Sequence, residues 1–353
     1  MTLLYNDSGD NMEYYDATTN QIITDKDIAN TPVTSNNTNI NSQSIINLYG
    51  EDLTAKEYVT NPAIKRDEEI MKMIMVLLTP EKSALLIGKA GIGKTSIVEG
   101  LAYRIINNNV PDKLKGYRVI KINSSTLVGK MNNNGREELV ISVLVEELKK
   151  MDKIILFIDE IHTLIGSANE SMDLANILKP AIDRGSIKII GATTDMEYNT
   201  YIVRDRAFLR RFDRVDVQEQ DEATTVQVLM GSLPKIEHQT GVRFKYNDYV
   251  SEMLVKSIVE ATSQYKRVYG LGAMYPDICF SVLTAAFSNA LYENRTEVTA
   301  LDVYMAIKNS KRIYPDSRIK ELDKFKKDFA QIAYEDGIEF PNVTIDEINE
   351  SEI

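Results

Sequence analysis

Residues 84–95 have the sequence ALLIGKAGIGKT, and this stretch decides the fold. It begins as a short apolar strand, continues as a glycine-rich loop and ends in the first residues of a helix. Gly88, Gly93, Lys94 and Thr95 match the phosphate-binding pattern G-x-x-x-x-G-K-[ST]. Glycines let backbone N–H groups curl around an anion, and the positive end of the following helix points at that anion. An ordinary glycine turn is the alternative, but this motif has both the strand and the helix that it requires.

The loop predicts a site for ATP and Mg²⁺. Lys94 would reach the β- and γ-phosphates, and the Thr95 hydroxyl would ligate the metal. The helix after the loop is expected over residues 94–106. The nucleotide-binding residues expected in the loop are Gly88, Lys89, Ala90, Gly91, Ile92, Gly93, Lys94, Thr95 and Ser96.

Composition restricts the class of protein. The 353 residues are 43% hydrophobic and 26% charged, as in a soluble globular protein with room for two or three compact units. The net charge is -11. This charge argues against a main role in gripping nucleic acid, although a local basic pore stays open.

The content of cysteine and histidine and the length of the apolar runs indicate the cellular compartment of the protein. The single cysteine, Cys279, allows no internal disulfide and suits a reducing environment. His162 and His238 are the two histidines, and without a cysteine cluster a structural zinc site is not expected. The longest apolar runs are too short to span a bilayer, and the N-terminus lacks a basic-then-apolar signal. We therefore expect a cytoplasmic protein with no membrane partner.

Apolar runs that alternate with helical patterns predict a mostly parallel sheet covered on both sides. The continuous apolar run IILFI, which starts at Ile154, is typical of a strand buried on both faces. Five strands are expected, at 84–87, 117–122, 154–159, 187–191 and 215–217. Helices are expected at 64–78, 94–106, 137–149 and 172–183, with a loop at 129–135. The predicted fold class is α/β, a five-stranded αβα sandwich.

From residue 221 onward the strand pattern stops, which predicts a smaller, all-helical subdomain that we call the lid. Its helices are expected at 223–233, 248–265, 276–292 and 300–309. A last helix at 319–333 has one apolar face, formed by Leu322, Phe325, Phe329 and Ile332. We expect this face to pack against its own chain, and docking to a partner is the alternative.

These patterns divide the chain into four parts. A flexible polar tail is expected over 1–48, the large nucleotide-binding subdomain over 49–218 and the lid over 219–312. The amphipathic helix and an acidic, loose end make up 313–353. Within the tail, a small hairpin around residues 14–23 is the alternative to disorder.

A second motif follows the buried strand. Ligands of open α/β sheets bind at the carboxyl ends of the strands, and this strand ends in Asp159 and Glu160. Asp159 would hold the metal through a water molecule, beside Thr95, and Glu160 would polarise the attacking water as general base. Two ordinary surface carboxylates are the alternative, which the neighbouring phosphate loop makes the weaker one.

Two further motifs are weak by themselves. Thr193 and Thr194 follow the strand at 187–191, where a hydroxyl could bond the water or the γ-phosphate. Arg210 and Arg211 precede the last strand. An arginine doublet is ordinarily a solvated surface, but arginine also neutralises charge that develops on a transferred phosphoryl group.

With these residues in view, the chain resembles the first AAA+ module of the Clp-type unfoldases, which are ring-forming ATPases that pull on protein substrates. The resemblance covers residues 49–312. Besides the phosphate loop, it rests on seven stretches: YGEDLT (49–54), NPAIKRDEEI (61–70), SIVEGLA (96–102), LFIDEIHT (156–163), NILKPA (176–181), GATT (191–194) and RRF (210–212).

The resemblance implies an AAA+ P-loop NTPase that forms a hexameric ring of its own copies, with ATP between subunits. On that basis Thr194 is the sensor threonine, and Arg210 and Arg211 are the fingers that reach a neighbour's ATP. Ile64 and its neighbours line the adenine pocket. His162 follows the acidic pair by family habit and is given no catalytic role.

Four departures from the family pattern bear on function. The segment that matches the central-pore loop, 129–135, has no aromatic residue to grip substrate, although Met131 could act as a softer paddle. Lys65 stands where the family usually has Gly, and Ile278 where it usually has Lys. The fourth departure is the lack of a second AAA+ module, of the family's N-terminal domain and of an Ile-Gly-Phe/Leu docking loop. We therefore expect a stand-alone module without a proteolytic partner.

Three functions follow as hypotheses. The first is an Mg-dependent ATPase ring that remodels or unfolds an unidentified protein or complex. The second is an ATP-gated assembly or scaffold protein that does not thread substrate, as the pore segment suggests. The third is a nucleic-acid loader, which other AAA+ branches supply and which the acidic net charge disfavours. ATP-dependent unfolding of a tagged protein separates the first from the second, and salt-sensitive binding to single strands would favour the third.

Overall fold

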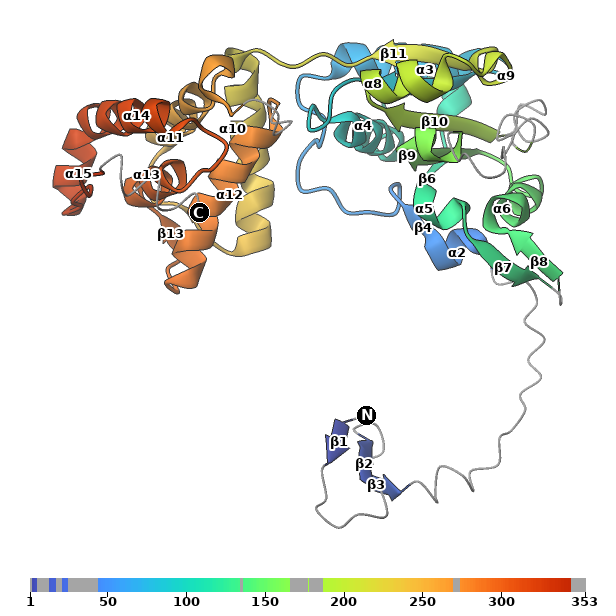
Figure 1. Ribbon diagram of the computed structural model, residues 1–353, viewed down its shortest axis with the longest axis horizontal. Helices are drawn as coiled ribbons and strands as arrows, with labels where there is room; N and C mark the ends of the chain where they lie inside the picture. Colours follow the sequence, from blue (N-terminus) through green and yellow to red (C-terminus); the bar gives the residue numbers. More distant parts are fainter. Residues whose placement is uncertain are drawn as a thin grey trace. The chain divides into compact units, whose positions relative to one another are not determined.

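The computed structural model describes residues 2–4, 13–16, 21–24, 44–133, 136–165, 177, 187–268 and 274–343. The chain divides into two compact units, Met1–Gln43 and Ser44–Ile353 (Figure 1). The first unit contains a three-stranded antiparallel sheet made of β1 (Thr2–Leu4), β2 (Glu13–Asp16) and β3 (Gln21–Thr24). Of the two alternatives for this segment, the structure has the hairpin, with β1 as an additional strand.

The second unit is built on a six-stranded sheet. Its spatial order is β11-β5-β10-β9-β6-β4, and every neighbouring pair is parallel except β4 with β6. The strands are β4 (Gly50–Asp52), β5 (Ser83–Ile87), β6 (Arg118–Asn123), β9 (Ile154–Asp159), β10 (Ile187–Thr193) and β11 (Phe212–Asp216). The five parallel strands are the five expected ones. The antiparallel edge strand β4 was not predicted, because three residues with two carboxylates carry no strand pattern.

Alternate residues of each central strand point into two separate cores. In β5, Ala84 and Leu86 join one core, and Leu85 and Ile87 join the other. One core contains the buried faces of α3 (Asp67–Leu78) and α4 (Lys94–Ile106), and the other contains those of α2 (Ile45–Tyr49) and α6 (Val140–Leu148). The sheet is therefore covered on both sides, as the continuous apolar strands predict. The shorter elements of this part are η1 (Asp112–Leu114), α5 (Ser124–Leu127), η2 (Ile161–Leu164), α8 (Asp195–Glu197), η3 (Tyr198–Ile202) and α9 (Arg206–Leu209).

Ordered structure of the second unit starts earlier than the predicted end of the tail at residue 48. Helix α2 buries Ile45 and Ile46, and Ser44 caps it by accepting a hydrogen bond from the backbone of Asn47. The carboxylate of Glu147 accepts a hydrogen bond from the backbone N–H of Ile45, at 2.7 Å. This contact spans a hundred residues of chain, so the local polar composition could not reveal it.

The predicted pore loop at 129–135 and the predicted helix start at 137 were wrong in part. The structure has an antiparallel hairpin of β7 (Lys130–Asn133) and β8 (Arg136–Leu139), and the helix α6 begins only at Val140. The side chain of Met131 packs against the core between the sheet and α6. The predicted helix at 172–183 lies outside the described residues, apart from residue 177.

The lid has its own hydrophobic core. Its elements are α10 (Glu222–Thr240), β12 (Arg243–Phe244), α11 (Asp248–Ala261), η4 (Gln264–Lys266), α12 (Asp277–Tyr292), β13 (Glu297–Val298), α13 (Ala300–Lys308), α14 (Pro315–Asp328) and α15 (Ala330–Asp336). The expectation of an all-helical lid needs one correction, since β12 and β13 form a short parallel pair. Two residues per strand are too few to produce a sequence pattern.

The amphipathic C-terminal segment packs against its own chain. Leu322, Phe325 and Phe329 are almost completely buried in the lid core, and Ile332 packs against it. The segment is two helices that meet at Phe329 and not one continuous helix. Its apolar face is therefore used inside the lid, which removes the reason for proposing a partner there. The acidic end at 344–353 lies outside the described residues.

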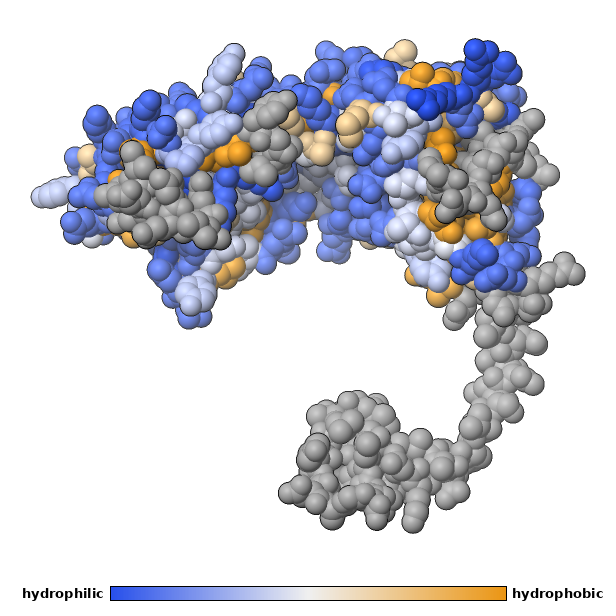
Figure 2. All heavy atoms as spheres, viewed as in Figure 1, coloured by the Kyte–Doolittle hydropathy of each residue, from blue (hydrophilic) through white to orange (hydrophobic). Residues whose placement is uncertain are grey.

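The surface agrees with the composition. Hydrophilic residues dominate the described part of the face shown in Figure 2. Among the described residues, no helix has the length and apolar character needed to cross a membrane.

Candidate functional site

The loop between β5 and α4 is closed tightly. Gly93 has φ +96°, a left-handed conformation that favours glycine, and it caps the N-terminus of α4. At Gly88, a Cβ would lie 2.4 Å from the carbonyl oxygen of Val217, so the position has no room for a side chain. The Nζ of Lys94 donates hydrogen bonds to the carbonyls of Gly88 (2.8 Å) and Lys89 (3.0 Å). The lysine is thus folded across its own loop, next to the place where the motif puts phosphates.

The electrostatic surroundings of Lys94 are mixed. Burial lowers the pKa of its ammonium group, and nearby carboxylates, chiefly those of Asp159 and Glu197, oppose this shift. A polyanionic ligand would oppose it further and favour the charged lysine.

Asp159 connects the two halves of the predicted metal site. Its Oδ2 accepts a hydrogen bond from the Thr95 hydroxyl at 3.0 Å, and its Oδ1 accepts one from the backbone N–H of Glu160 at 3.0 Å. Glu160 is exposed and has φ +51° and ψ +43°, a left-handed conformation that is strained for a residue with a side chain. Strain of this kind is typical of functional sites.

The oxygens of Thr95 and Asp159 suit Mg²⁺. Both are oxygen donors of the kind that Mg²⁺ prefers, and a hydrogen bond of 3.0 Å holds them side by side. Among the described residues, no group of three or more His, Cys, Asp or Glu could hold a metal. A nucleotide-bound Mg²⁺ uses one or two protein groups and takes its other ligands from phosphates and water.

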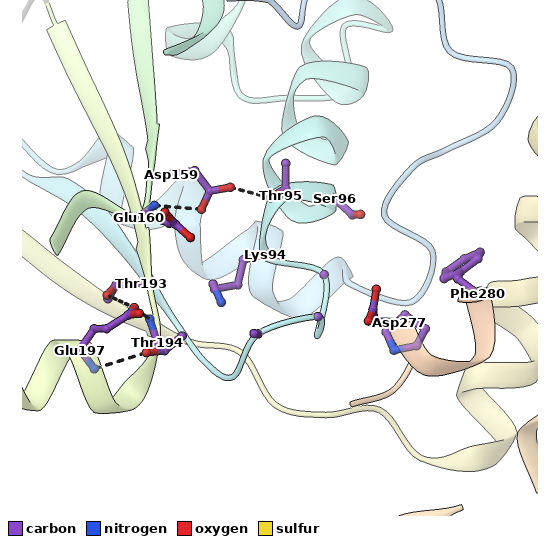
Figure 3. Close-up of a pocket in the computed structure, with 14 residues that line it drawn as sticks. Lys94, Thr95, Ser96, Asp159, Glu160, Thr193, Thr194, Glu197, Asp277 and Phe280 are labelled. Atoms are coloured by element: carbon purple, nitrogen blue, oxygen red, sulfur yellow. Dashed lines mark hydrogen bonds between the residues drawn. The ribbon is translucent and has the colours of Figure 1, made fainter. Parts of the chain in front are cut away.

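These residues line one cavity of ≈ 420 Å³. Figure 3 shows Lys94, Thr95, Asp159 and Glu160 around it, with Thr194 on the β10 side. The volume lies within the range of ordinary ligand sites, about 300–1,000 Å³. The complete lining is Ala90, Gly91, Gly93, Lys94, Thr95, Ser96, Asp159, Glu160, Thr193, Thr194, Glu197, Pro276, Asp277 and Phe280.

Glu197 is a site residue that the sequence reasoning missed. One of its oxygens, Oε2, accepts hydrogen bonds from the backbone N–H of Thr194 (2.9 Å) and the hydroxyl of Thr193 (3.1 Å). The Nδ1 of His162 lies 3.1 Å from the same oxygen and must carry a proton to bond it, because a carboxylate only accepts. Thr194 in turn accepts from the backbone of Glu197, which completes a capping box. The pattern Thr194-x-x-Glu197 is the sequence signal that could have found it.

The same hydrogen bonds control the ionisation of Glu197. Burial by itself would raise the pKa of this carboxyl, but the hydrogen bonds from Thr194 and Thr193 and the nearby His162 outweigh burial and lower the pKa. His162 therefore contacts the carboxylate that binds Thr193 and Thr194.

A second cavity of ≈ 390 Å³ shares Gly93, Ser96 and several lid residues with the first. Its apolar lining includes Ile64, the residue expected at the adenine, and it also contains Ile92. The remaining apolar lining side chains are Pro62, Ala63, Val228, Ile236, Pro276 and Phe280. Lys65 has φ +58°, a left-handed conformation that glycine adopts with less strain than lysine does.

The lid supplies residues that the sequence did not single out. Pro276, Asp277 and Phe280, around the start of α12, line both cavities. Asp277 lies close to the phosphate loop, since a Cβ at Gly91 would approach its Cβ to 2.8 Å. Ile278 is completely buried in the lid core and does not line either cavity.

Several predicted residues lie outside the cavities. Arg210 is exposed at the end of α9, and Arg211 is half-buried, with Nη1 donating to the carbonyl of Ala207 at 3.0 Å. Neither arginine lines the cavities of its own chain. Gly88 and Lys89 also lie outside the linings and contribute through the carbonyls that bind Lys94.

Comparisons with known proteins place this site in a family. The model of the AAA family, ATPases associated with various cellular activities, matches residues 84–219. Chaperone protein ClpB of Helicobacter hepaticus is 44% identical over 194 residues, which are 54% of this chain and 23% of ClpB. The S. cerevisiae Hsp104–ADP complex is similar in structure, with TM-score 0.61, 31% identity, and coverage of 79% of this chain and 48% of that one. An extended S. cerevisiae Hsp104–casein complex gives TM-score 0.60 and 32% identity, covering 72% of this chain and 43% of that one.

The chain therefore spans about a quarter of the ClpB relative and less than half of the Hsp104 chains. The matched family model includes the phosphate loop and the acidic pair. The chain thus contains an AAA module of the Clp/Hsp100 family, similar to those of ClpB and Hsp104.

Proposed function

We propose that this protein is an Mg-dependent ATPase that works as a hexameric ring of its own copies and uses ATP to remodel a protein or protein complex. The observation that carries the proposal is that Lys94, Thr95, Asp159 and Glu160 meet at one cavity. Membership of the AAA family implies ATP hydrolysis. The matched Hsp104 structures, which are complexes with ADP and with casein, support a nucleotide and a protein substrate for this chain too.

Each residue has a role that its position supports. Lys94 exchanges the carbonyls of its own loop for phosphate oxygens. Thr95 and Asp159 would hold Mg²⁺, which would neutralise charge on the phosphates. Glu160, exposed beside Asp159, orients and deprotonates the attacking water, and Thr194 at the end of β10 orients the water or the γ-phosphate.

Arg210 and Arg211 complete the site of a neighbouring copy. Their position outside the cavities of their own chain supports this role. A guanidinium group stabilises the charge on the transferred phosphoryl group, which in other phosphate-transfer enzymes contributes about 10³–10⁵ in rate.

The test of hydrolysis is Glu160→Gln. We expect ATP binding to be kept and turnover to fall by about 10²–10⁴, the usual contribution of a general base. The exposed Glu252 of α11 provides the matched control, since Glu252→Gln should turn over like the wild type. Size measurement of the Glu160→Gln protein with and without ATP should show a larger species with ATP. A strict monomer under saturating ATP, or unchanged turnover, would contradict the proposal.

The test of the arginines is complementation between two inactive variants. The double variant Arg210→Ala/Arg211→Ala keeps an intact phosphate site, and Lys94→Ala keeps intact arginines. Each variant should be inactive alone. A mixture should regain activity at sites that combine the phosphate loop of the arginine double variant with the arginines of a neighbouring Lys94→Ala copy. A mixture that stays inactive while it forms mixed rings would place the arginines in their own chain's site.

A second candidate is an ATP-gated assembly protein that closes a ring but does not thread substrate. The position of Met131 favours it, because this side chain packs against its own core and is not held out as a paddle. The experiment is an unfolding assay with a tagged fluorescent protein. Loss of fluorescence that requires ATP would exclude the second candidate, and stable fluorescence with active hydrolysis would favour it over the remodelling function.

A further inference from the structure

The connection between β11 and α10, residues 217–221, joins the large subdomain to the lid (Figure 1). Two of its three central residues hydrogen-bond to the segment before α3, and the third hydrogen-bonds to the lid. The carbonyl of Gln218 accepts a hydrogen bond from Arg66 (3.0 Å), and the side-chain amide of Gln220 donates one to the carbonyl of Lys65 (3.3 Å). Both partners belong to the segment that carries Ile64. Glu219, between them, faces the lid.

Glu219 makes the contacts that reach the nucleotide side of the lid. One oxygen, Oε1, accepts from Nη1 of Arg267 at 2.6 Å and from the backbone N–H of Tyr275 at 2.7 Å. Tyr275 immediately precedes Pro276 and Asp277, which line both cavities. A single carboxylate oxygen therefore binds the chain directly ahead of the lid's contribution to the site.

The residues that bind this carboxylate, Arg267 and Tyr275, contact each other and hydrogen-bond to the backbone of the lid. The guanidinium carbon of Arg267 lies 4.0 Å from the ring centre of Tyr275, and Nε donates to the carbonyl of Thr262 at 2.6 Å. The Tyr275 hydroxyl donates to the carbonyl of Val259 at 2.6 Å. Arg267 is 8% exposed and Tyr275 4% exposed, whereas the side chain of Glu219 is 24% exposed. The half-buried Glu219 neutralises a buried arginine, an interaction that is costly to break on one side only.

We propose that Glu219 is a positioning residue for the nucleotide site: it latches Pro276 and Asp277 of the lid against the phosphate loop and sets how tightly nucleotide is held. The inference rests on the proposed function. It assigns Glu219 no part in the chemical step, because the residue lines neither cavity and contacts none of Lys94, Thr95, Asp159 and Glu160. Loosening the latch should weaken nucleotide binding and leave the bond-breaking step intact.

The experiment compares Glu219→Ala, Glu219→Gln and the control Glu252→Ala. In Glu219→Ala, the KM for ATP and the Kd for a fluorescent ADP should each rise about tenfold, as expected for the loss of charge-assisted hydrogen bonds, while kcat changes less than about twofold. Glu219→Gln keeps an acceptor for the Tyr275 N–H and should recover part of the affinity. Glu252→Ala should match the wild type. A fall in kcat with unchanged KM, or a loss of thermal stability alone, would overturn the proposal.

The pair Glu219–Arg267 can be tested by itself in a double-mutant cycle. If the two side chains act through one contact, Glu219→Ala combined with Arg267→Met should raise Kd no more than the worse single variant does. Additive rises in Kd would overturn the latch.

Hydrogen exchange of the nucleotide-free protein separates this inference from the proposed function. In Glu219→Ala, the backbone amides of residues 274–280 should exchange faster than in the wild type, and those of α13 should not change. Unchanged exchange at 274–280 would overturn the latch even if the wild type hydrolyses ATP. A wild type that binds no nucleotide would instead overturn the proposed function, with the latch still decided by its exchange rates.

Discussion

The Nη2 of Arg66 donates a hydrogen bond of 2.7 Å to the carbonyl oxygen of Ile92, and this contact ties the segment before α3 to the phosphate loop. The same guanidinium donates to the carbonyl of Gln218 and pairs with Glu69 at 2.6 Å. Arg66 is only 5% exposed. One side chain thus connects the segment that carries Ile64, the loop that would hold the phosphates, and the connection to the lid.

The first prediction concerns this arginine. Arg66→Met should lower the free energy of unfolding by about 3 kcal/mol, because it removes one partner of a buried ion pair and leaves two carbonyls without their donor. Urea unfolding followed by circular dichroism measures the change. Arg243→Met, at an exposed position, should cost about 0.5 kcal/mol or less. Equal losses in both variants would show that the contacts of Arg66 contribute nothing particular.

The second prediction concerns the left-handed backbone of Lys65. Lys65→Gly should raise the free energy of unfolding by about 0.5 kcal/mol, since relief of a strain of about 1–2 kcal/mol exceeds the extra entropy of the unfolded chain. The same substitution in the middle of α3, Lys72→Gly, should lower it by about 1 kcal/mol. Thermal unfolding of both variants gives the two signs. A lower free energy of unfolding in Lys65→Gly would mean that contacts of the lysine side chain outweigh the strain of its left-handed backbone.

The third prediction concerns Mg²⁺. Removing divalent ions with a chelator should stop hydrolysis, and Asp159→Asn should raise the Mg²⁺ concentration needed for half-maximal turnover by about 10–100-fold. A magnesium titration of the steady-state rate measures this. The exposed Asp195 serves as the control, and Asp195→Asn should leave the titration unchanged. An identical Mg²⁺ requirement in Asp159→Asn would move the metal away from this carboxylate.

The fourth prediction concerns Glu197 and pH. Its pKa is lowered from the ordinary value of 4.5, so its contribution to stability is present above pH 4.5 and is lost as pH falls through the lowered value. Glu197→Gln should therefore cost about 1 kcal/mol at pH 7, the usual contribution of a helix cap, and almost nothing at the acidic end. Unfolding free energies from pH 3 to pH 7 give the profile.

The control for this profile is Glu252→Gln, which should cost little at any pH. A difference between Glu197→Gln and wild type that stays constant from pH 7 to pH 3 would show that the charge of Glu197 is not what stabilises the cap.

The parts of the site that could be predicted are those whose signal lies within one short stretch of the sequence. The strand, loop and helix around Gly93 follow from contiguous residues, and Asp159 follows from the end of a buried strand. Both patterns have a direct physical cause, in backbone geometry for the first and burial for the second. Glu197 was equally readable, because a threonine followed three residues later by glutamate is a capping signal.

Other parts depend on contacts between distant segments. Asp277 and Phe280 reach the cavities only because the lid packs as it does, and α2 is ordered only because Ile45 and Ile46 find a core and Glu147. The hairpin of β7 and β8 is an intermediate case. In the sequence, the dipeptide Asn134-Gly135 is a typical hairpin signal that the loop assignment overlooked.

The segment from Thr194 to Arg211 could couple hydrolysis in one copy of the chain to hydrolysis in the next. It starts with a threonine that lines the cavity and ends with an arginine that does not, and Ile202 and Phe208 pin it to the core in between. Because the segment is anchored to the core at these two residues, a movement of one end should also move the other end. If the arginines complete the site of the next copy, loss of phosphate at one cavity would shift the arginines that reach its neighbour. Hydrolysis would then proceed from each copy to the next around the ring and not at random.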